Sequence, residues 1–358
     1  MLLIKHIPLN HYFCTSKLNL PITFHIASRY AETHPDEDVL VIDMCPQANV
    51  SMMLLGGGTT GEDIVIKQCQ MQSPQTVVGY ITESIVAGQN SVPDSIRFAI
   101  RPCTSNDNMP QNLYLLCGDG NLEIIAPELS RRADEPRMTA NQEWPWVRVH
   151  SIIRNYITDF AQQRAEKSRN VAIFIDTNPA FSIYTELAIV AADKLICPVN
   201  ADDSSKTATS AMAILLYGSN PPHPIYGSWT FAAKAQEYKV NIPRIHLLIG
   251  NRMAQYGGTA TAYAAMSQET AKQMFGLYQQ HPDYFSPMST NINSIGDFIQ
   301  VYSVYLRDFN TAGVVASHTG CLLSNMGGKC NVYGKDVQLN KDRIQECLKA
   351  VDDVIAKL

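Results

Sequence analysis

Short apolar runs recur along the chain, and polar or turn-forming residues bound each of them. Four of these runs occupy residues 39–42, 171–175, 195–199 and 245–249. A continuous apolar run of this length is typical of a strand that is buried on both faces, as in a parallel sheet. The pattern therefore predicts that the four runs form adjacent central strands.

Between these runs, apolar residues return every three or four positions, which is the period of an amphipathic helix. Residues 146–167 are expected to form one long helix, and the last helix is expected to follow Asn340 as its N-cap. Another helix is expected to have Ser73 as N-cap and Pro74 at its first position. The alternation of strands and helices predicts an α/β fold, a doubly wound and mostly parallel sheet with helices on both faces.

Length and composition narrow the class of protein. The chain has 358 residues, of which 46% are hydrophobic and 17% charged, so it can bury a sizeable core and we expect one domain. Its net charge of −5 gives no general attraction to nucleic acid or to an anionic membrane. The nine cysteines include no C-x-x-C pair, and no apolar run approaches 18 residues. These features predict a cytoplasmic protein with reduced thiols and no membrane span.

Two aspartates follow predicted strands in matching contexts. Asp43 ends the run at 39–42 and Asp176 ends the run at 171–175, in the sequences "DMCP" and "DTNP". Ligands of a doubly wound sheet bind beyond the carboxyl ends of its strands. Two carboxylates at that edge can hold magnesium and orient a nucleophile, whereas a single aspartate more often caps a turn. The matching pair favours a functional role.

Several longer stretches resemble the ParA/MinD family of P-loop ATPases, and most closely its ParA-like branch. They read "VLVIDMCPQANVS", "NLYLLCGDGNLEI", "VAIFIDTNPAFSIYTELAIVAADKLICPVNAD", "LLIGN" and "RDFNTAGVVASHTG". The D-x-x-P-Q-x-N and "FIDTNPAFS" stretches are the specific parts of this resemblance. It covers residues 23–358, which we expect to form a ParA-like α/β domain, whereas residues 1–22 are expected to diverge most from the family.

The resemblance implies roles for individual residues and partners. Asp43 would position magnesium and the attacking water, Asp176 would lie near the magnesium ion, and Asn251 would recognise adenine. ATP and Mg²⁺ are the implied cofactors. A homodimer is implied, a ParB-like partner protein or non-specific DNA fits the family, and the net charge does not favour DNA.

The phosphate loop of the family has no counterpart in this chain. The family motif K-G-G-x-G-K-[ST]-[ST] precedes the first helix, where its glycines let backbone N–H groups approach the phosphates. This chain has no glycine before Gly56, and "CTSKLNLPITF" stands at residues 14–24. Pro21 and Ile22 cannot adopt the backbone conformations that the glycines allow. The sequence therefore predicts that the phosphate cradle is missing.

Two alignments of this segment with the family motif remain open. If Lys17 matches the first lysine of the motif, Ile22 stands at the second lysine and Thr23 at the hydroxyl that binds magnesium. If the alignment runs backwards from the helix, Asn19 and Leu20 stand at those two places. Neither alignment restores the loop.

A second departure is Cys45, where the family usually has an aspartate associated with activation of the attacking water. A thiol is a soft and poor magnesium ligand, so packing beside the loop is the favoured role of Cys45. Gly56–Gly58 and residues 117–121 have no lysine in the phosphate-loop position, and we expect a flexible turn and a tight turn there.

The resemblance implies a ParA-like, nucleotide-dependent partitioning or positioning ATPase. The missing loop predicts weak ATP binding and leaves hydrolysis by this chain an open question. The alternative is a nucleotide-independent scaffolding or interaction protein on the same fold. A reductase iron-protein relative is disfavoured, because no paired cysteines are present to hold an iron–sulfur cluster.

Overall fold

The computed structural model describes residues 2–7, 14–15, 22–88, 91–178, 180–199, 203–219, 225–250 and 260–358. Within these residues the strands form an eight-stranded sheet, ordered β4-β3-β5-β2-β1-β6-β7-β8, and a separate β9-β10 hairpin. The strands are β1 (Leu2–Ile7), β2 (Cys14–Thr15), β3 (Asp38–Met44), β4 (Leu113–Leu116), β5 (Val171–Thr177), β6 (Lys194–Val199), β7 (Arg244–Gly250), β8 (Ser303–Tyr305), β9 (Lys329–Val332) and β10 (Lys335–Gln338).

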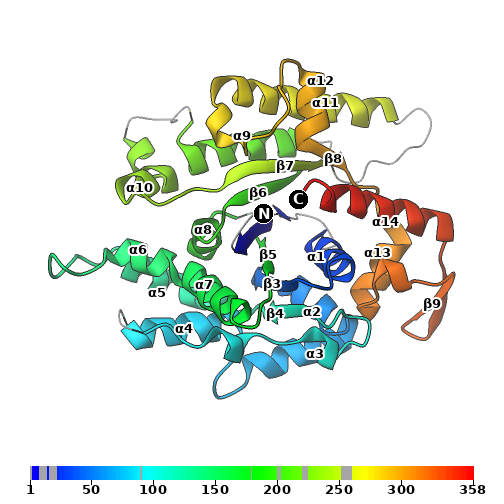
Figure 1. Cartoon of the computed structure of the whole chain (residues 1–358), viewed down its shortest axis with the longest axis horizontal. Coiled ribbons are helices and arrows are strands. Elements are labelled where there is room, and N and C mark those ends of the chain that lie inside the picture. The colour runs from blue at the N-terminus through cyan, green and yellow to red at the C-terminus, as the bar shows by residue number, and fades with distance from the viewer. Residues whose placement is uncertain are drawn as a thin grey trace.

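Helices cover both faces of the large sheet, as the sequence predicts. Figure 1 shows α7 and α8 on one side of β3 and β5, with α1 and α14 on the other. The helices are α1 (Ile22–Thr33), α2 (Asn49–Leu54), α3 (Gly58–Cys69), α4 (Val77–Ala87), α5 (Leu122–Ala133), α6 (Pro145–His150), α7 (Ile152–Ala165), α8 (Ile183–Val190), α9 (Asp203–Tyr217), α10 (Phe231–Glu237), α11 (Ala260–Gln280), α12 (Ile295–Tyr302), α13 (Asn310–Thr319) and α14 (Lys341–Ile355). Among the described residues, no helix is both long and apolar enough to cross a membrane.

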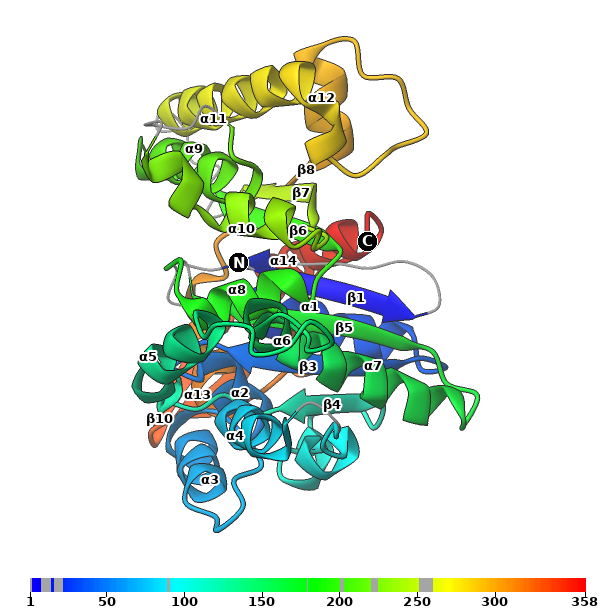
Figure 2. The ribbon, with the colours of Figure 1, turned by 90° about the vertical axis from the view of Figure 1, so that its left-hand side faces the viewer.

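The four predicted strands are confirmed as β3, β5, β6 and β7. β3 and β5 are parallel neighbours, and so are β6 and β7. The prediction that all four are adjacent is wrong, because β2 and β1 come between β5 and β6 in the sheet. Figure 2 shows β1 in this place. The side chains of β3 and β5 are buried along their whole length, as their continuous apolar runs require.

The N-terminal strand β1 runs against the direction of its neighbours. It pairs antiparallel with β5 on one side and with β6 on the other. β1 contains no proline, so each of its residues can donate a hydrogen bond to the ladder.

Local hydrogen bonds set the helix boundaries. Asn340 is the N-cap of α14, as predicted, and its side chain accepts a hydrogen bond from the N–H of Arg343. The N-cap of α4 is Thr76 and not Ser73, because the Thr76 hydroxyl accepts from the N–H of Gly79 at 3.1 Å. The single helix expected at 146–167 is two helices, α6 and α7, which meet at Ser151.

The glycine run after α2 is a packed contact, so the expectation of a flexible turn is wrong. Gly57 has a positive φ of 71°. A Cβ atom on Gly57 would lie 2.4 Å from the backbone nitrogen of Gly320. Only glycine allows α2 and α3 to approach the end of α13 this closely.

Candidate functional site

The carboxyl ends of β3 and β5 bring two buried aspartates together. The two strands are parallel, and Asp43 pairs directly with Asp176 in their register. Their side chains therefore lie side by side at one edge of the sheet, where doubly wound folds bind ligands. Asp43 is 0% exposed and Asp176 is 5% exposed.

The first turn of α1 adds a hydroxyl to this pair. Thr23 is buried, and its Oγ1 donates a hydrogen bond to Oδ1 of Asp176 at 2.5 Å. α1 packs on β3 and β5, which aims its N-terminus at the same edge of the sheet. Positive partial charge at a helix N-terminus favours an anionic group nearby.

Backbone and side-chain donors surround the carboxylate of Asp43. Its Oδ2 accepts from the N–H and the hydroxyl of Ser51, at 2.9 and 2.8 Å. Its Oδ1 accepts from the N–H of Cys45 at 3.1 Å. These bonds close the segment between β3 and α2 onto the carboxylate, so Asp43 organises this segment.

Burial and proximity disfavour two negative charges at this edge. Burial, and then the charge of Asp176, raise the pKa of Asp43 to about 7, against the lowering effect of the hydrogen bonds from Ser51 and Cys45. Burial also raises the pKa of Asp176, while the hydrogen bond from Thr23 lowers it. A cation bound beside the two carboxylates would offset both the burial of their charges and their repulsion, and would so favour the ionised form of Asp43.

The donor set fits magnesium. Two carboxylates and a hydroxyl supply oxygen ligands of the kind that Mg²⁺ prefers, and Mg²⁺ usually keeps several waters. Among the described residues there is no group of three or more His, Cys, Asp or Glu side chains placed to hold a metal. An ion at this edge would be held by Thr23 and Asp176, with Asp43 reaching it through water, and a soft metal is not favoured.

Two of the residues predicted to bind nucleotide lie outside the described part of the chain. These are Lys17 in the N-terminal segment and Asn251 directly after β7. Their roles remain predictions. The structure brings together the other three predicted site residues, Thr23, Asp43 and Asp176.

Cys45 lies beside the pair without adding chemistry to it, and the partners of Asp119 lie elsewhere. Burial, and then the charges of Asp43 and Asp176, raise the pKa of Cys45 to about 12, so its thiol is neutral at physiological pH. Asp119, in the tight turn after β4, accepts hydrogen bonds from Thr76 and Asn121. Asp119 thus serves to hold the turn.

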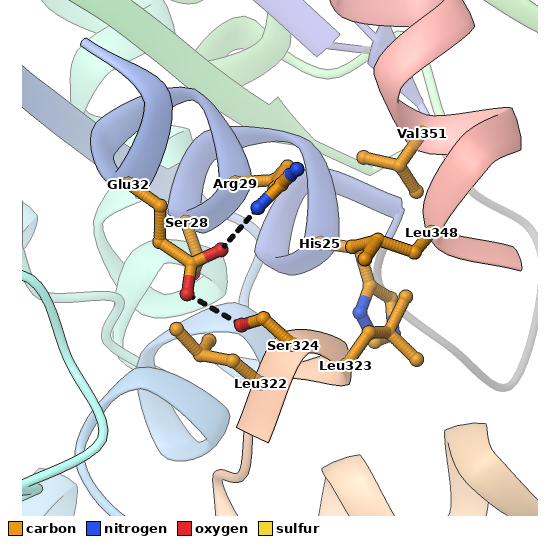
Figure 3. Close-up of a pocket in the computed structure, with 9 residues that line it drawn as sticks. All are labelled: His25, Ser28, Arg29, Glu32, Leu322, Leu323, Ser324, Leu348 and Val351. Carbon is orange, nitrogen blue, oxygen red and sulfur yellow. Dashed lines mark hydrogen bonds and ion pairs between the residues drawn. The ribbon is translucent and has the colours of Figure 1, made fainter. Parts of the chain in front are cut away.

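Two hollows lined by described residues lie away from this pair of aspartates. Figure 3 shows residues that line a space beside α1, among them His25 and Ser28. The space measures about 10 Å³, which is about the size of one water molecule. Glu32 spans it between Arg29 and Ser324. A second hollow of about 290 Å³ lies between the beginnings of α13 and α14. Neither is lined by Asp43 or Asp176.

Sequence reasoning missed Ser51 and Gly118. A Cβ atom on Gly118 would lie 2.9 Å from Cγ of Asp43, so glycine is required there. Ser51 lies only eight residues after Asp43, at the end of the most specific family stretch. This short separation in sequence was the available signal for Ser51. Which donors reach the carboxylate of Asp43, however, depends on how α2 packs against the end of β3.

The fold of this chain is similar to that of proteins with known structures. No family model and no curated protein sequence matches the chain. Among solved structures, McdA from Cyanothece in its apo form superposes with a TM-score of 0.53 at 14% identity, covering 96% of this chain and 98% of that one. A variant of McdA in complex with ATP gives the same score and identity, with coverage of 96% and 95%. A plasmid partition protein from Borrelia burgdorferi superposes with a TM-score of 0.46 at 13% identity, covering 96% and 98%.

The similarity to McdA extends over nearly the whole of both chains, and at this identity it shows the fold. The resemblance found in the sequence is therefore confirmed at the level of the fold: the chain is a doubly wound α/β domain with the fold of McdA.

Proposed function

We propose that this chain is a ParA-type partitioning or positioning protein whose nucleotide site keeps its magnesium side and has lost its phosphate loop. The observation that carries the proposal is the hydrogen bond from Thr23 to Asp176, next to Asp43. A hydroxyl in the first turn of α1 and two aspartates at the ends of parallel strands form the magnesium side of such a site.

The position of Thr23 supports one of the two alignments with the family motif. Thr23 is the second residue of α1 and contacts Asp176, as a magnesium-binding hydroxyl of that motif would. In this alignment Lys17 is the first lysine of the motif. Ile22 then stands in place of the second lysine, and its side chain is buried.

The residues for the triphosphate do not fit as well as those for magnesium. An isoleucine cannot neutralise phosphate charge, and the stretch from Lys17 to Ile22 contains no glycine. We therefore propose that ATP–Mg²⁺ binds weakly, and no hydrolytic step is assigned. When bound, ATP would supply the phosphates that complete the magnesium coordination.

Partners follow from the same proposal. A homodimer, a ParB-like partner protein and recognition of adenine by Asn251 rest on the family resemblance alone. The alternative is a scaffolding protein that uses the fold without nucleotide, and the buried Ile22 is the observation that favours it.

Calorimetry with ATP–Mg²⁺ tests the proposal in two steps. The natural chain should show only weak binding, and a Kd of about 1 µM or tighter would contradict the missing cradle. A restored loop, made by the substitutions Leu18→Gly, Asn19→Gly, Pro21→Gly and Ile22→Lys, should recover binding.

The matched control is the restored chain with the additional change Thr23→Ala, which should lose binding again because the magnesium hydroxyl is gone. If the restored chain folds and shows no ATP binding, the proposal that the magnesium side of the site is retained is refuted. The scaffolding alternative is then supported.

A further inference from the structure

Ser51 connects three elements at the edge of the sheet that carries the candidate site. It lies in α2 and is 0% exposed. Its hydroxyl donates to Oδ2 of Asp43 and accepts from the N–H of Gly118, each at 2.8 Å. Its own N–H donates to the same oxygen of Asp43 at 2.9 Å. One side chain thus links the end of β3, the start of α2 and the turn after β4.

The two aspartates differ in how much of their hydrogen-bonding capacity the described residues use. Both oxygens of Asp43 accept from protein donors, two from Ser51 and one from Cys45. For Asp176, one oxygen accepts from the hydroxyl of Thr23, which is itself a possible magnesium ligand. A carboxylate with both oxygens engaged is fixed in orientation and has less capacity for a metal ion.

The backbone of Gly118 also restricts the position of the Asp43 side chain. A Cβ atom at this position would lie 2.9 Å from Cγ and 3.0 Å from Oδ2 of Asp43. The backbone of Gly118 therefore packs directly against the carboxylate and donates to Ser51 beside it. Movement of Asp43 would have to displace this backbone.

We propose that Ser51 is the positioning residue of this site. It holds the Asp43 carboxylate in one orientation beside Asp176, so that Asp43 organises the segment from Cys45 to Ser51, while Thr23 and Asp176 contact the cation. The metal-binding part of this inference rests on the proposed function, whereas the fixing of Asp43 can be tested without metal.

The test compares Ser51→Ala with Ser51→Thr, in the full chain and at fixed pH. Without metal, we would measure hydrogen exchange at the amide of Gly118 and the carboxyl ¹³C resonance of Asp43 by NMR. With Mn²⁺ alone as a probe for Mg²⁺, electron paramagnetic resonance would give the affinity. The control is Ser95→Ala, since Ser95 is also buried and its hydroxyl has no partner among the described residues.

Ser51→Ala should speed exchange at Gly118 about tenfold, shift the Asp43 resonance and weaken Mn²⁺ binding about tenfold, because one net hydrogen bond corresponds to roughly that factor. Ser51→Thr should restore all three readouts, and Ser95→Ala should change none. If Ser51→Ala does not fold, Ser51→Cys keeps the size of the side chain, weakens its hydrogen bonds and should move the readouts in the same direction.

Two results would overturn the inference. One is a folded Ser51→Ala protein in which the Gly118 amide and the Asp43 resonance are unchanged. The other is a change in both with Mn²⁺ affinity as in the natural chain. If the natural chain binds no Mn²⁺, the proposed magnesium site fails, and the metal-free readouts alone decide whether Ser51 fixes Asp43.

Discussion

Replacing Asp176 with asparagine should stabilise the metal-free protein at alkaline pH while abolishing its response to magnesium. Asp43 and Asp176 are buried and paired directly across parallel strands, so their charges repel each other in an environment that water barely reaches. Asp176→Asn keeps the shape of the side chain and an oxygen to accept from Thr23, and it removes one of the two charges.

The magnitude follows from the strand geometry. Neighbouring strands lie about 5 Å apart, and two unit charges at about 5 Å interact with about 3 kcal/mol at an effective dielectric constant of about 20. The hydrogen bond from Thr23 becomes a bond to a neutral group, which costs about 1 kcal/mol. The free energy of unfolding should therefore rise by about 2 kcal/mol at pH 8.

Whether Asp176→Asn raises or lowers the free energy of unfolding depends on pH. The pKa of Asp43 is raised to about 7, above its value in the unfolded chain, so the folded protein binds more protons between about pH 4 and pH 7. The stability of the natural chain should fall as pH rises through this window and then stay level. At pH 5 Asp43 is protonated, so the repulsion is absent and Asp176→Asn should lower stability by about 1 kcal/mol.

Urea unfolding at pH 5 and pH 8, without metal, would measure these differences. Thr23→Val is the matched control, because it removes the hydrogen bond to Asp176 without removing a charge. It should destabilise at both pH values, and at pH 8 at least as much as at pH 5, since that bond favours the charged carboxylate. Adding MgCl₂ at pH 8 should stabilise the natural chain and leave Asp176→Asn unchanged. If Asp176→Asn loses more stability at pH 8 than at pH 5, the proposed repulsion between the two aspartates is refuted.

Three further predictions concern single positions. Cys45→Asp, made in the chain with the restored loop, should raise ATP turnover because a carboxylate can orient water; turnover no higher than that of Cys45→Ser would indicate a packing role. Gly118→Ala should destabilise by about 1–3 kcal/mol in urea unfolding, since its Cβ would lie 2.9 Å from Cγ of Asp43, whereas Gly276→Ala meets nothing within 4 Å and should stabilise by up to about 1 kcal/mol. Asn340→Ala should cost about 1 kcal/mol in the same measurement by removing the cap of α14, and an unchanged midpoint would count against that cap.

Local pattern was enough to locate β3, β5, β6 and β7 and several of the helices. The runs at 39–42 and 171–175 are continuous and apolar because both faces of β3 and β5 are covered, and a chain segment carries that information by itself. The same reasoning places Asp43 and Asp176 at strand ends. The cap of α14 was also readable, since the bond between Asn340 and Arg343 spans only three residues.

The order and direction of the strands could not be read in this way. β1 occupies the middle of the sheet in the reverse direction, between β5 and β6. An apolar run looks the same whichever way it pairs, so only the tertiary pairing sets its direction. The start of α4 at Thr76, three residues later than expected, likewise depended on which hydroxyl reaches the N–H of Gly79.

The sequence by itself determined the residue types of the candidate site, which are two carboxylates at the ends of buried strands and a threonine at the start of a helix. The tertiary structure decided that Asp43 and Asp176 share one register position and that Thr23 reaches Asp176 across 153 positions of sequence. It also decided that Ser51 and Gly118 hold Asp43. The physical reason is that apolar periodicity is a property of neighbours along the chain, whereas charge coupling and hydrogen bonding depend on atoms that only folding brings within reach.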